Sequence, residues 1–212
     1  MATNLPPGSG EPQLAEPCSP KSRGWYQPRD LPHLDRDHST QMITYRLADS
    51  LPREVARRRA EECDPARPHQ YRRRIETSLD AGYGSCCLGD PAVAQQIVAT
   101  WQHFAPERYL LRVWVVMPNH VHVLITQRPG WSLGRIVQSW KSWTARVIVQ
   151  RLGELGLAAP RGWQRDYWDR LIRDADHYCR VRDYIHRNPV MAGLCRSPEE
   201  WPWSSAKADA RE

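Results

Sequence analysis

The stretch Trp114-Val115-Val116-Met117-Pro118-Asn119-His120-Val121-His122-Val123-Leu124-Ile125 carries the strongest signal for both fold and chemistry in this chain. Two apolar runs are separated by a Pro-Asn turn, which predicts an antiparallel hairpin with strands over 109–116 and 120–126. His120 and His122 are i and i+2 in the second strand, so both side chains point to the same face of the sheet. Two imidazoles on one face can converge on one metal ion.

Strands and helices alternate outward from this hairpin. Residues 41–47 alternate β-forming and polar side chains and predict a first strand. A helical stretch follows from Ser50 to Leu79, with a break expected at Pro65 and Pro68, and Asp90-Pro91 opens a second helix to about Phe104.

The C-terminal half continues in the same way. Apolar spacing predicts a long helix capped by Ser132, and a short edge strand is expected over 168–172. A last helix runs from Asp174 to about Arg187 and is expected to end at Asn188-Pro189. This order predicts an α+β fold, a ferredoxin-like (RRM-like) antiparallel sheet with helices packed on one face.

The chain of 212 residues is long enough for one domain with appendages. Residues 1–22 are rich in Pro, Gly, Ser and Glu and predict a disordered tail. Residues 23–40 mix aromatics with prolines and predict an extended arm, packed on the domain or lying against a ligand. We expect one catalytic domain over 41–206 and a C-terminal tail over 207–212.

Charge and cysteine usage narrow the class of protein. The net charge is +6, and only three of the 30 basic residues are lysines, so 27 are arginines. Arginine suits phosphate oxygens and stacks on bases, which favours a nucleic-acid partner, although a GC-rich genome gives the same bias without any ligand. Six cysteines without a C-x-x-C pair indicate neither a disulfide framework nor a zinc ribbon. No membrane span is evident, and a cytoplasmic, nucleoid-associated protein is expected.

The last predicted helix adds a second chemical feature. Tyr184 and Asn188 are i and i+4, so they share one face of that helix. Two imidazoles and an amide oxygen leave positions open for water and a phosphate oxygen, which is typical of a catalytic site for Mg²⁺ or Mn²⁺. Tyr184 would then be the nucleophile, and Tyr178 is its rival on the same helix. The alternatives are structural histidines and a core aromatic.

These motifs together carry a resemblance to a known family. They are Trp114 to Ile125, Ser139 to Ser142, Trp163 to Asp174, Tyr184 to Val190 and the Trp201-Pro202-Trp203-Ser204-Ser205 segment, with Gly24-Trp25-Tyr26 and Leu31-Pro32-His33 before them. In this order they resemble the REP-associated tyrosine transposases of the HUH single-tyrosine transposase superfamily. The resemblance covers about residues 24–206.

The resemblance implies an HUH endonuclease-type fold and a divalent ion held by His120, His122 and Asn188. It implies that Tyr184 attacks single-stranded DNA to give a 5′-phosphotyrosine. The implied substrates are REP palindromes, hairpins with a flanking tetranucleotide, and insertion-sequence relatives carry Gln where this chain has Asn188. Six side chains are candidate phosphate or stacking contacts for such hairpins: Lys141, Trp163, Arg165, Tyr167, Arg170 and Arg173.

Three interpretations remain open from the sequence. The first is a metal-dependent nuclease and strand transferase for single-stranded DNA. The second is a non-catalytic protein that binds REP hairpins. The third, a replication initiator or relaxase, would more often show a tyrosine pair or a longer chain. The residues do not decide between a monomer and a homodimer.

Overall fold

The second strand of the hairpin and the strand predicted over 41–47 form the centre of a four-stranded antiparallel sheet. The computed structural model describes residues 24–28, 31–52, 54–55, 57, 68–157 and 161–209. The sheet strands are β3 (Thr40–Arg46), β4 (Tyr109–Val116), β5 (His120–Gln127) and β6 (Trp168–Leu171), in the order β4-β5-β3-β6. This is the strand order of a ferredoxin-like sheet, and β6 lies at an edge as predicted.

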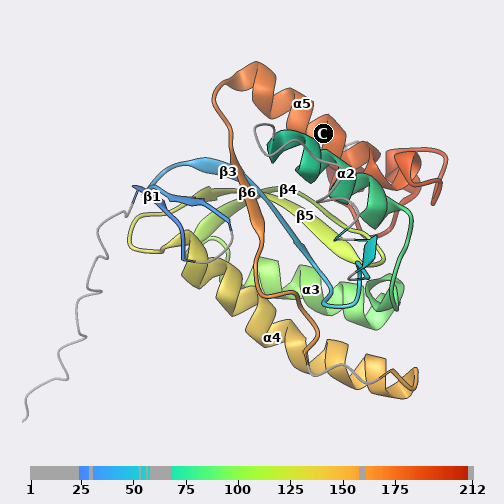
Figure 1. Cartoon of the computed structure of the whole chain (residues 1–212). Coiled ribbons are helices and arrows are strands. Elements are labelled where there is room, and N and C mark those ends of the chain that lie inside the picture. The colour runs from blue at the N-terminus through green and yellow to red at the C-terminus, as the bar shows by residue number, and fades with distance from the viewer. Residues whose placement is uncertain are drawn as a thin grey trace, which may run out of the picture.

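One face of the sheet is covered by α3 (Pro91–Phe104) and α4 (Leu133–Glu154), as Figure 1 shows. Asp90 caps α3 through the N–H groups of Ala92 and Val93, and Ser132 caps α4 through that of Arg135. Both caps stand where the sequence predicts them. A large apolar cluster fills this layer, with Trp101 donating a hydrogen bond to Tyr45.

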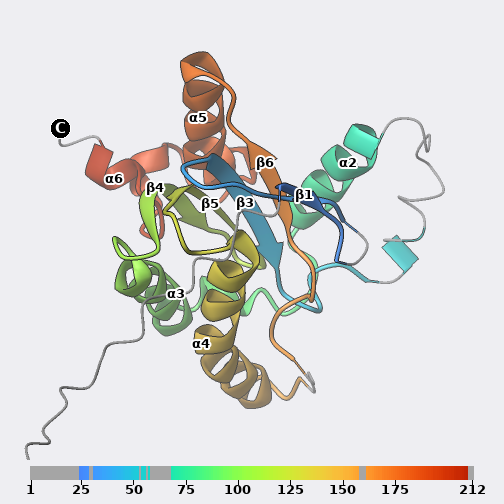
Figure 2. The same cartoon turned by 90° about the vertical axis from the view of Figure 1, so that its left-hand side faces the viewer.

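The opposite face is also covered, which differs from the expected single helical layer. The helix α5 (Ala175–Met191) packs Val181 and Ile185 on Met42 and Leu124, and α2 (Pro68–Asp80) lies on the same side of the sheet but apart from α5 (Figures 1 and 2). The reason is in the strands, because this second face carries an apolar cluster of its own, with Met42, Val113, Val115 and Leu124, beside the polar side chains of β3 and β5. The α+β, ferredoxin-like class is confirmed, and its sheet is buried on both faces.

The end of α5 also differs from the prediction. The helix continues through Pro189 to Met191 instead of ending at Asn188-Pro189. A proline in the last turn removes a single backbone donor, and the turn survives that loss. Gly193, at φ 72°, ends the helix: its N–H binds the Val190 carbonyl and the Leu194 N–H binds the Pro189 carbonyl. Asn188 is therefore held inside the helix.

The Trp201-to-Ser205 segment fixes α5 over the sheet. It follows a short 3-10 helix, η2 (Pro198–Glu200), and leads into α6 (Ala206–Asp209), where the predicted C-terminal tail begins. The Ser205 hydroxyl accepts from the Trp114 N–H of β4 and lies 2.9 Å from Nε2 of His186 on α5. One serine thus ties the edge strand to the helix that carries Tyr184.

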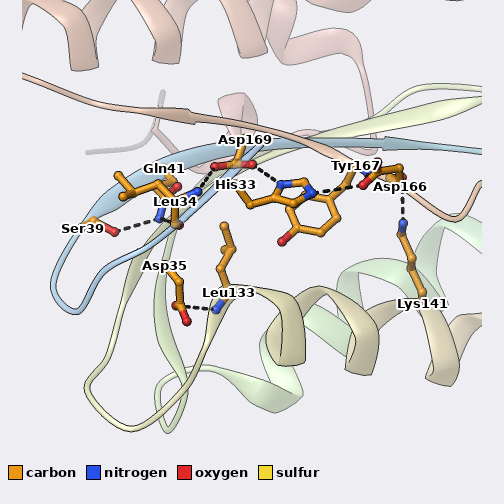
Figure 3. Close-up of polar contacts among 10 residues, drawn as sticks. All are labelled: His33, Leu34, Asp35, Ser39, Gln41, Leu133, Lys141, Asp166, Tyr167 and Asp169. Atoms are coloured by element: carbon orange, nitrogen blue, oxygen red, sulfur yellow. Dashed lines mark hydrogen bonds and ion pairs between the residues drawn. The ribbon is translucent and has the colours of Figure 1, made fainter. Parts of the chain in front are cut away.

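The N-terminal arm packs on the domain. Its strands β1 (Gly24–Tyr26) and β2 (His33–Asp35) pair with each other, and Figure 3 shows His33 between Asp169 and Asp166. Burial alone would lower the pKa of His33, but the hydrogen bonds and charges of these carboxylates raise it above its ordinary value. Asp35 accepts from the Leu133 N–H at the start of α4. The predicted tail over 1–22 lies outside the described residues.

The region between β3 and α3 holds one described helix, a loop and a short 3-10 helix. The α2 helix starts at Pro68, where a break is predicted, and most of residues 53–67 lie outside the described part. A loop and a 3-10 helix, η1 (Cys87–Gly89), then lead to α3. None of the described helices combines the length and the apolar character that crossing a membrane requires.

Candidate active site

The two histidines converge on the face of the sheet that α5 covers. His120 and His122 are 1% and 0% exposed, and their Nε2 atoms are 3.2 Å apart. Two nitrogens bound to one ion at about 2.1 Å lie roughly 3.0–3.4 Å apart, depending on the coordination angle. The spacing of the pair therefore fits a single divalent ion.

Neighbouring side chains orient both rings. Asn119 donates through Nδ2 to the carbonyls of Leu79 and Tyr83, so its Oδ1 faces His120 Nδ1 at 2.7 Å. An amide oxygen only accepts, so Nδ1 of His120 carries the proton and Nε2 presents a lone pair. On the other ring, Nδ1 of His122 lies 2.8 Å from the Thr44 hydroxyl.

Electrostatics keep His120 neutral. Burial, with the charge of Arg46 as a second cause, lowers the pKa of His120 to about 3. Arg46 pairs directly with His120 in the β3–β5 ladder and so lies on the same face of the sheet. A neutral imidazole is the form that binds a metal ion.

Tyr184 and Asn188 come to this face from α5. The Tyr184 ring lies edge-on to that of His122, with ring centroids 5.4 Å apart. Asn188, one turn later, is 0% exposed, and neither Nδ2 nor Oδ1 has a hydrogen-bond partner among the described residues. Buried amides are almost always paired, so this one is suited to a ligand. His120, His122 and Tyr184 are thus brought together, and Asn188 lies on the same helix one turn after Tyr184.

The donor set fits a hard divalent ion. Among the described residues no three His, Cys, Asp or Glu side chains form a ready-made metal site. The two imidazoles and the amide would therefore be the principal donors, an arrangement that would leave positions open for substrate oxygens. Asp80, at the end of α2, lies further out, with Oδ1 3.9 Å from Nε2 of His120.

A basic pocket adjoins the tyrosine. It measures about 420 Å³, and its lining is Arg170, Arg173, Asp174, His177, Arg180, Val181 and Tyr184. Three guanidinium groups at the mouth of such a pocket attract a phosphate chain. Two of the predicted DNA contacts, Arg170 and Arg173, are therefore placed beside the predicted nucleophile.

Three other predicted DNA contacts lie inside the protein. Lys141 donates from Nζ to the carbonyls of residues 164, 165 and 166 at 3.0–3.1 Å, and Trp163 donates to Thr144. Tyr167 stacks on His33 with ring centroids 4.1 Å apart (Figure 3 shows both residues). These three side chains are largely buried and hold the loop before β6. Their role as DNA contacts stays a prediction.

Arg165 is exposed and remains a prediction. It lines a groove of about 510 Å³ along α4 that also includes Arg146 and Arg161. This groove is separate from the pocket that Tyr184 lines.

Asn119, Arg46 and Asp80 were not identified from the sequence as site residues. Asn119 is a typical turn residue, so its presence in the hairpin needs no functional reason. Its position directly before His120 is the sequence feature from which its role could have been predicted. Arg46 can be identified only from the β3–β5 register, and Asp80 only from the packing of α2 on the sheet. Neither is available from one sequence.

Comparison with known proteins agrees with this geometry. Residues 93–188, which include both histidines, Tyr184 and Asn188, match the family model described as transposase IS200 like. Over these residues the chain is similar to the IS200-like transposases. The predicted resemblance to REP-associated tyrosine transposases is confirmed by named relatives.

Two relatives illustrate the similarity. A REP-associated tyrosine transposase of Escherichia coli (strain K12) is 29% identical over 99 residues, 47% of this chain and 55% of that protein. A putative REP-associated tyrosine transposase of Haemophilus influenzae (strain ATCC 51907 / DSM 11121 / KW20 / Rd) is 41% identical over 109 residues, 45% and 58% of the two chains. The chain thus spans little more than half the length of these relatives.

The similarity to a solved structure covers more of the chain than residues 93–188. The REP-associated tyrosine transposase bound to a REP hairpin is 19% identical, with a TM-score of 0.53 over 87% of this chain and 86% of that one. At this identity the match shows that the two chains share a fold, and it shows no more than that.

Proposed function

We propose that the chain is a REP-associated transposase that cuts and rejoins single-stranded DNA through Tyr184. The observation that carries this proposal is the position of the Tyr184 ring against His122, with the unpartnered amide of Asn188 one turn away. The solved relative is bound to a REP hairpin, and a hairpin of this kind is the substrate we propose here.

In the proposed reaction the Tyr184 hydroxyl oxygen attacks the phosphorus of one phosphodiester. The new bond is a 5′-phosphotyrosine, and the bond to the 3′ oxygen breaks, so that oxygen leaves with a proton as a free 3′-hydroxyl. The phenolic proton passes to solvent. The covalent link conserves the bond energy, so a second 3′-hydroxyl can reverse the step and join a different end.

A divalent ion, Mg²⁺ or Mn²⁺, would supply charge neutralisation at the phosphate. His120, His122 and Asn188 are the residues that would hold it. The phenol has an ordinary pKa of about 10, so its attack needs this help. The guanidinium groups of Arg170, Arg173 and Arg180 would hold the strand beside Tyr184, and Arg46 adds positive charge near His120.

The test is a cleavage assay with labelled single-stranded hairpins that carry randomised flanking tetranucleotides. We expect a covalent protein–DNA band on a denaturing gel with Mn²⁺ or Mg²⁺ and none with chelator. Tyr184→Phe should abolish the band while hairpin affinity changes less than about twofold, because a single hydroxyl contributes little to binding such a charged ligand. Tyr178→Phe is the matched control and should retain the band.

Binding without any covalent band in the wild-type protein would contradict the proposal. It would instead support the non-catalytic hairpin-binding protein. A band that persists in Tyr184→Phe would show that the nucleophile is a different residue.

A further inference from the structure

A carboxylate approaches the histidine pair from a part of the chain outside the matched transposase domain. Asp80 is the last residue of α2, and its Oδ1 lies 3.9 Å from Nε2 of His120. The side chain is 22% exposed, so it is only partly open to solvent. The matched domain begins only at residue 93.

The end of α2 is fixed to the strand that carries the histidines. Ile75 and Leu79 are buried with Leu51, and Trp168 of β6 packs on this cluster. The Leu79 carbonyl accepts from Asn119 Nδ2, the same side chain whose Oδ1 faces His120. One amide therefore sets the position of both the histidine ring and the helix end next to Asp80.

The loop after α2 is also held in place. Gly84 has φ 87°, and a Cβ there would meet the backbone oxygen of Asp49 at 2.5 Å. The Asp49 side chain accepts from the Ser85 N–H. The return of the chain from α2 is thus specified by the packing around Gly84, which limits how far Asp80 can move from His120.

We infer that Asp80 is a further protein ligand of the divalent ion, completing a site of two imidazoles, one amide and one carboxylate. The inference rests on the proposed function. Two ligands of one ion held about 2.1 Å away are at most about 4.2 Å apart, so 3.9 Å is within reach after a small side-chain rotation. A carboxylate oxygen shifts the preference of the site toward the hard ions Mg²⁺ and Mn²⁺.

Mn²⁺ binding to the full chain tests this inference without any DNA. The signal of free Mn²⁺ in electron paramagnetic resonance gives the dissociation constant for each variant. We expect Asp80→Asn to raise it at least about tenfold, since even supporting groups of metal ligands contribute about that much. Asp80→Glu keeps a carboxylate and should recover part of the affinity.

Glu76→Gln is the matched control. Glu76 lies one turn earlier on α2 and raises the pKa of Asp80 by its charge, so the variant removes the same charge from the same helix. It should change the dissociation constant less than about threefold, because attraction without ligation is weakened by solvent. An equal effect in both variants would overturn the inference.

The remaining outcomes separate this inference from the proposed function. If Asp80→Asn binds Mn²⁺ as the wild type does while His120→Ala does not, Asp80 is no ligand and the transposase proposal stands. If the wild-type chain binds no Mn²⁺, both fail. Thermal unfolding in chelator shows whether each variant is folded. If Asp80→Asn does not fold, Asp80→Glu serves as the test variant in its place.

Discussion

At the scale of single residues, the site depends on two kinds of buried polar group. Some have no described hydrogen-bond partner, and others are held in place by one. Asn188 is the clearest case, because a fully buried amide whose two polar atoms lack a described hydrogen-bond partner costs free energy in the protein alone. Proteins retain such groups where a ligand satisfies them. Stability and function are therefore expected to oppose each other at this position.

Replacing Asn188 by Leu separates the two effects. We expect the free energy of unfolding in chelator to rise by about 1 kcal/mol, since an unsatisfied amide is removed and apolar volume is kept. Mn²⁺ affinity should fall at least about tenfold, and Asn188→Gln, which keeps the amide, should lose less. Urea unfolding measures the free energy of unfolding, and an Mn²⁺ titration measures the affinity. A loss of stability above about 1 kcal/mol would indicate a structural hydrogen bond instead.

The sequence predicted the residues of the site better than their surroundings. His120 and His122 follow from the two-residue repeat of a strand, and Tyr184 with Asn188 from the four-residue spacing of a helix. Lys141, Trp163 and Tyr167 were predicted as DNA contacts and are largely buried, because amphipathic side chains suit a DNA surface and a buried loop equally well. The arm and α4 bury these side chains by packing on them, and both elements are distant from residues 163–167 in the sequence.

At the scale of elements, helix starts were predictable and the end of α5 was not. Asp90 and Ser132 cap their helices through local hydrogen bonds that the sequence displays. The end of α5 was assigned to Pro189, but the left-handed Gly193 sets it. A proline weakens a last turn, whereas a glycine that can adopt positive φ provides the bonds that close it.

The arm is an element whose attachment depends on pH. His33 is buried between Asp166 and Asp169, and its pKa is raised in the folded chain. Its contribution to stability is thus fully present below the unfolded pKa of about 6.5 and is lost as pH rises through the higher folded value. Tyr26, Tyr167 and Lys141 lie near this cluster, and Lys141 is held by backbone carbonyls.

His33→Ala tests this attachment. At pH 6 we expect the free energy of unfolding to fall by about 3 kcal/mol, because a buried carboxylate loses its partner. The difference from the wild type should shrink as the pH is raised toward 9. Urea unfolding over this range measures it, and a difference that stays constant with pH would show that His33 acts by packing alone.

At the scale of the whole molecule, the second helical layer is what makes the site. No sequence pattern places α5 on the face opposite α3 and α4, because the alternation within a single strand does not reveal that each face carries an apolar cluster. With α5 on that face, Tyr184 lies against His122 of the same chain. One chain therefore holds all the predicted catalytic residues.

A mixing experiment tests whether the site is complete within one chain. Tyr184→Phe and His120→Ala should each be inactive, and a mixture should form no more covalent adduct than either alone. If subunits exchanged catalytic helices, an equal mixture would recover about a quarter of the wild-type adduct, since heterodimers would hold one intact site. Adduct yield on a denaturing gel distinguishes the two results.

The proposed chemistry is decided by identifying the residue that becomes linked to DNA. After reaction with a single-stranded hairpin and Mn²⁺, nuclease and trypsin digestion leaves Tyr184 in the peptide 183–187 and Tyr178 in the peptide 174–180. We expect mass spectrometry to find the nucleotide phosphate on the peptide 183–187. A nucleotide on the peptide 174–180, or an adduct on neither peptide, would contradict the assignment of Tyr184 as the nucleophile.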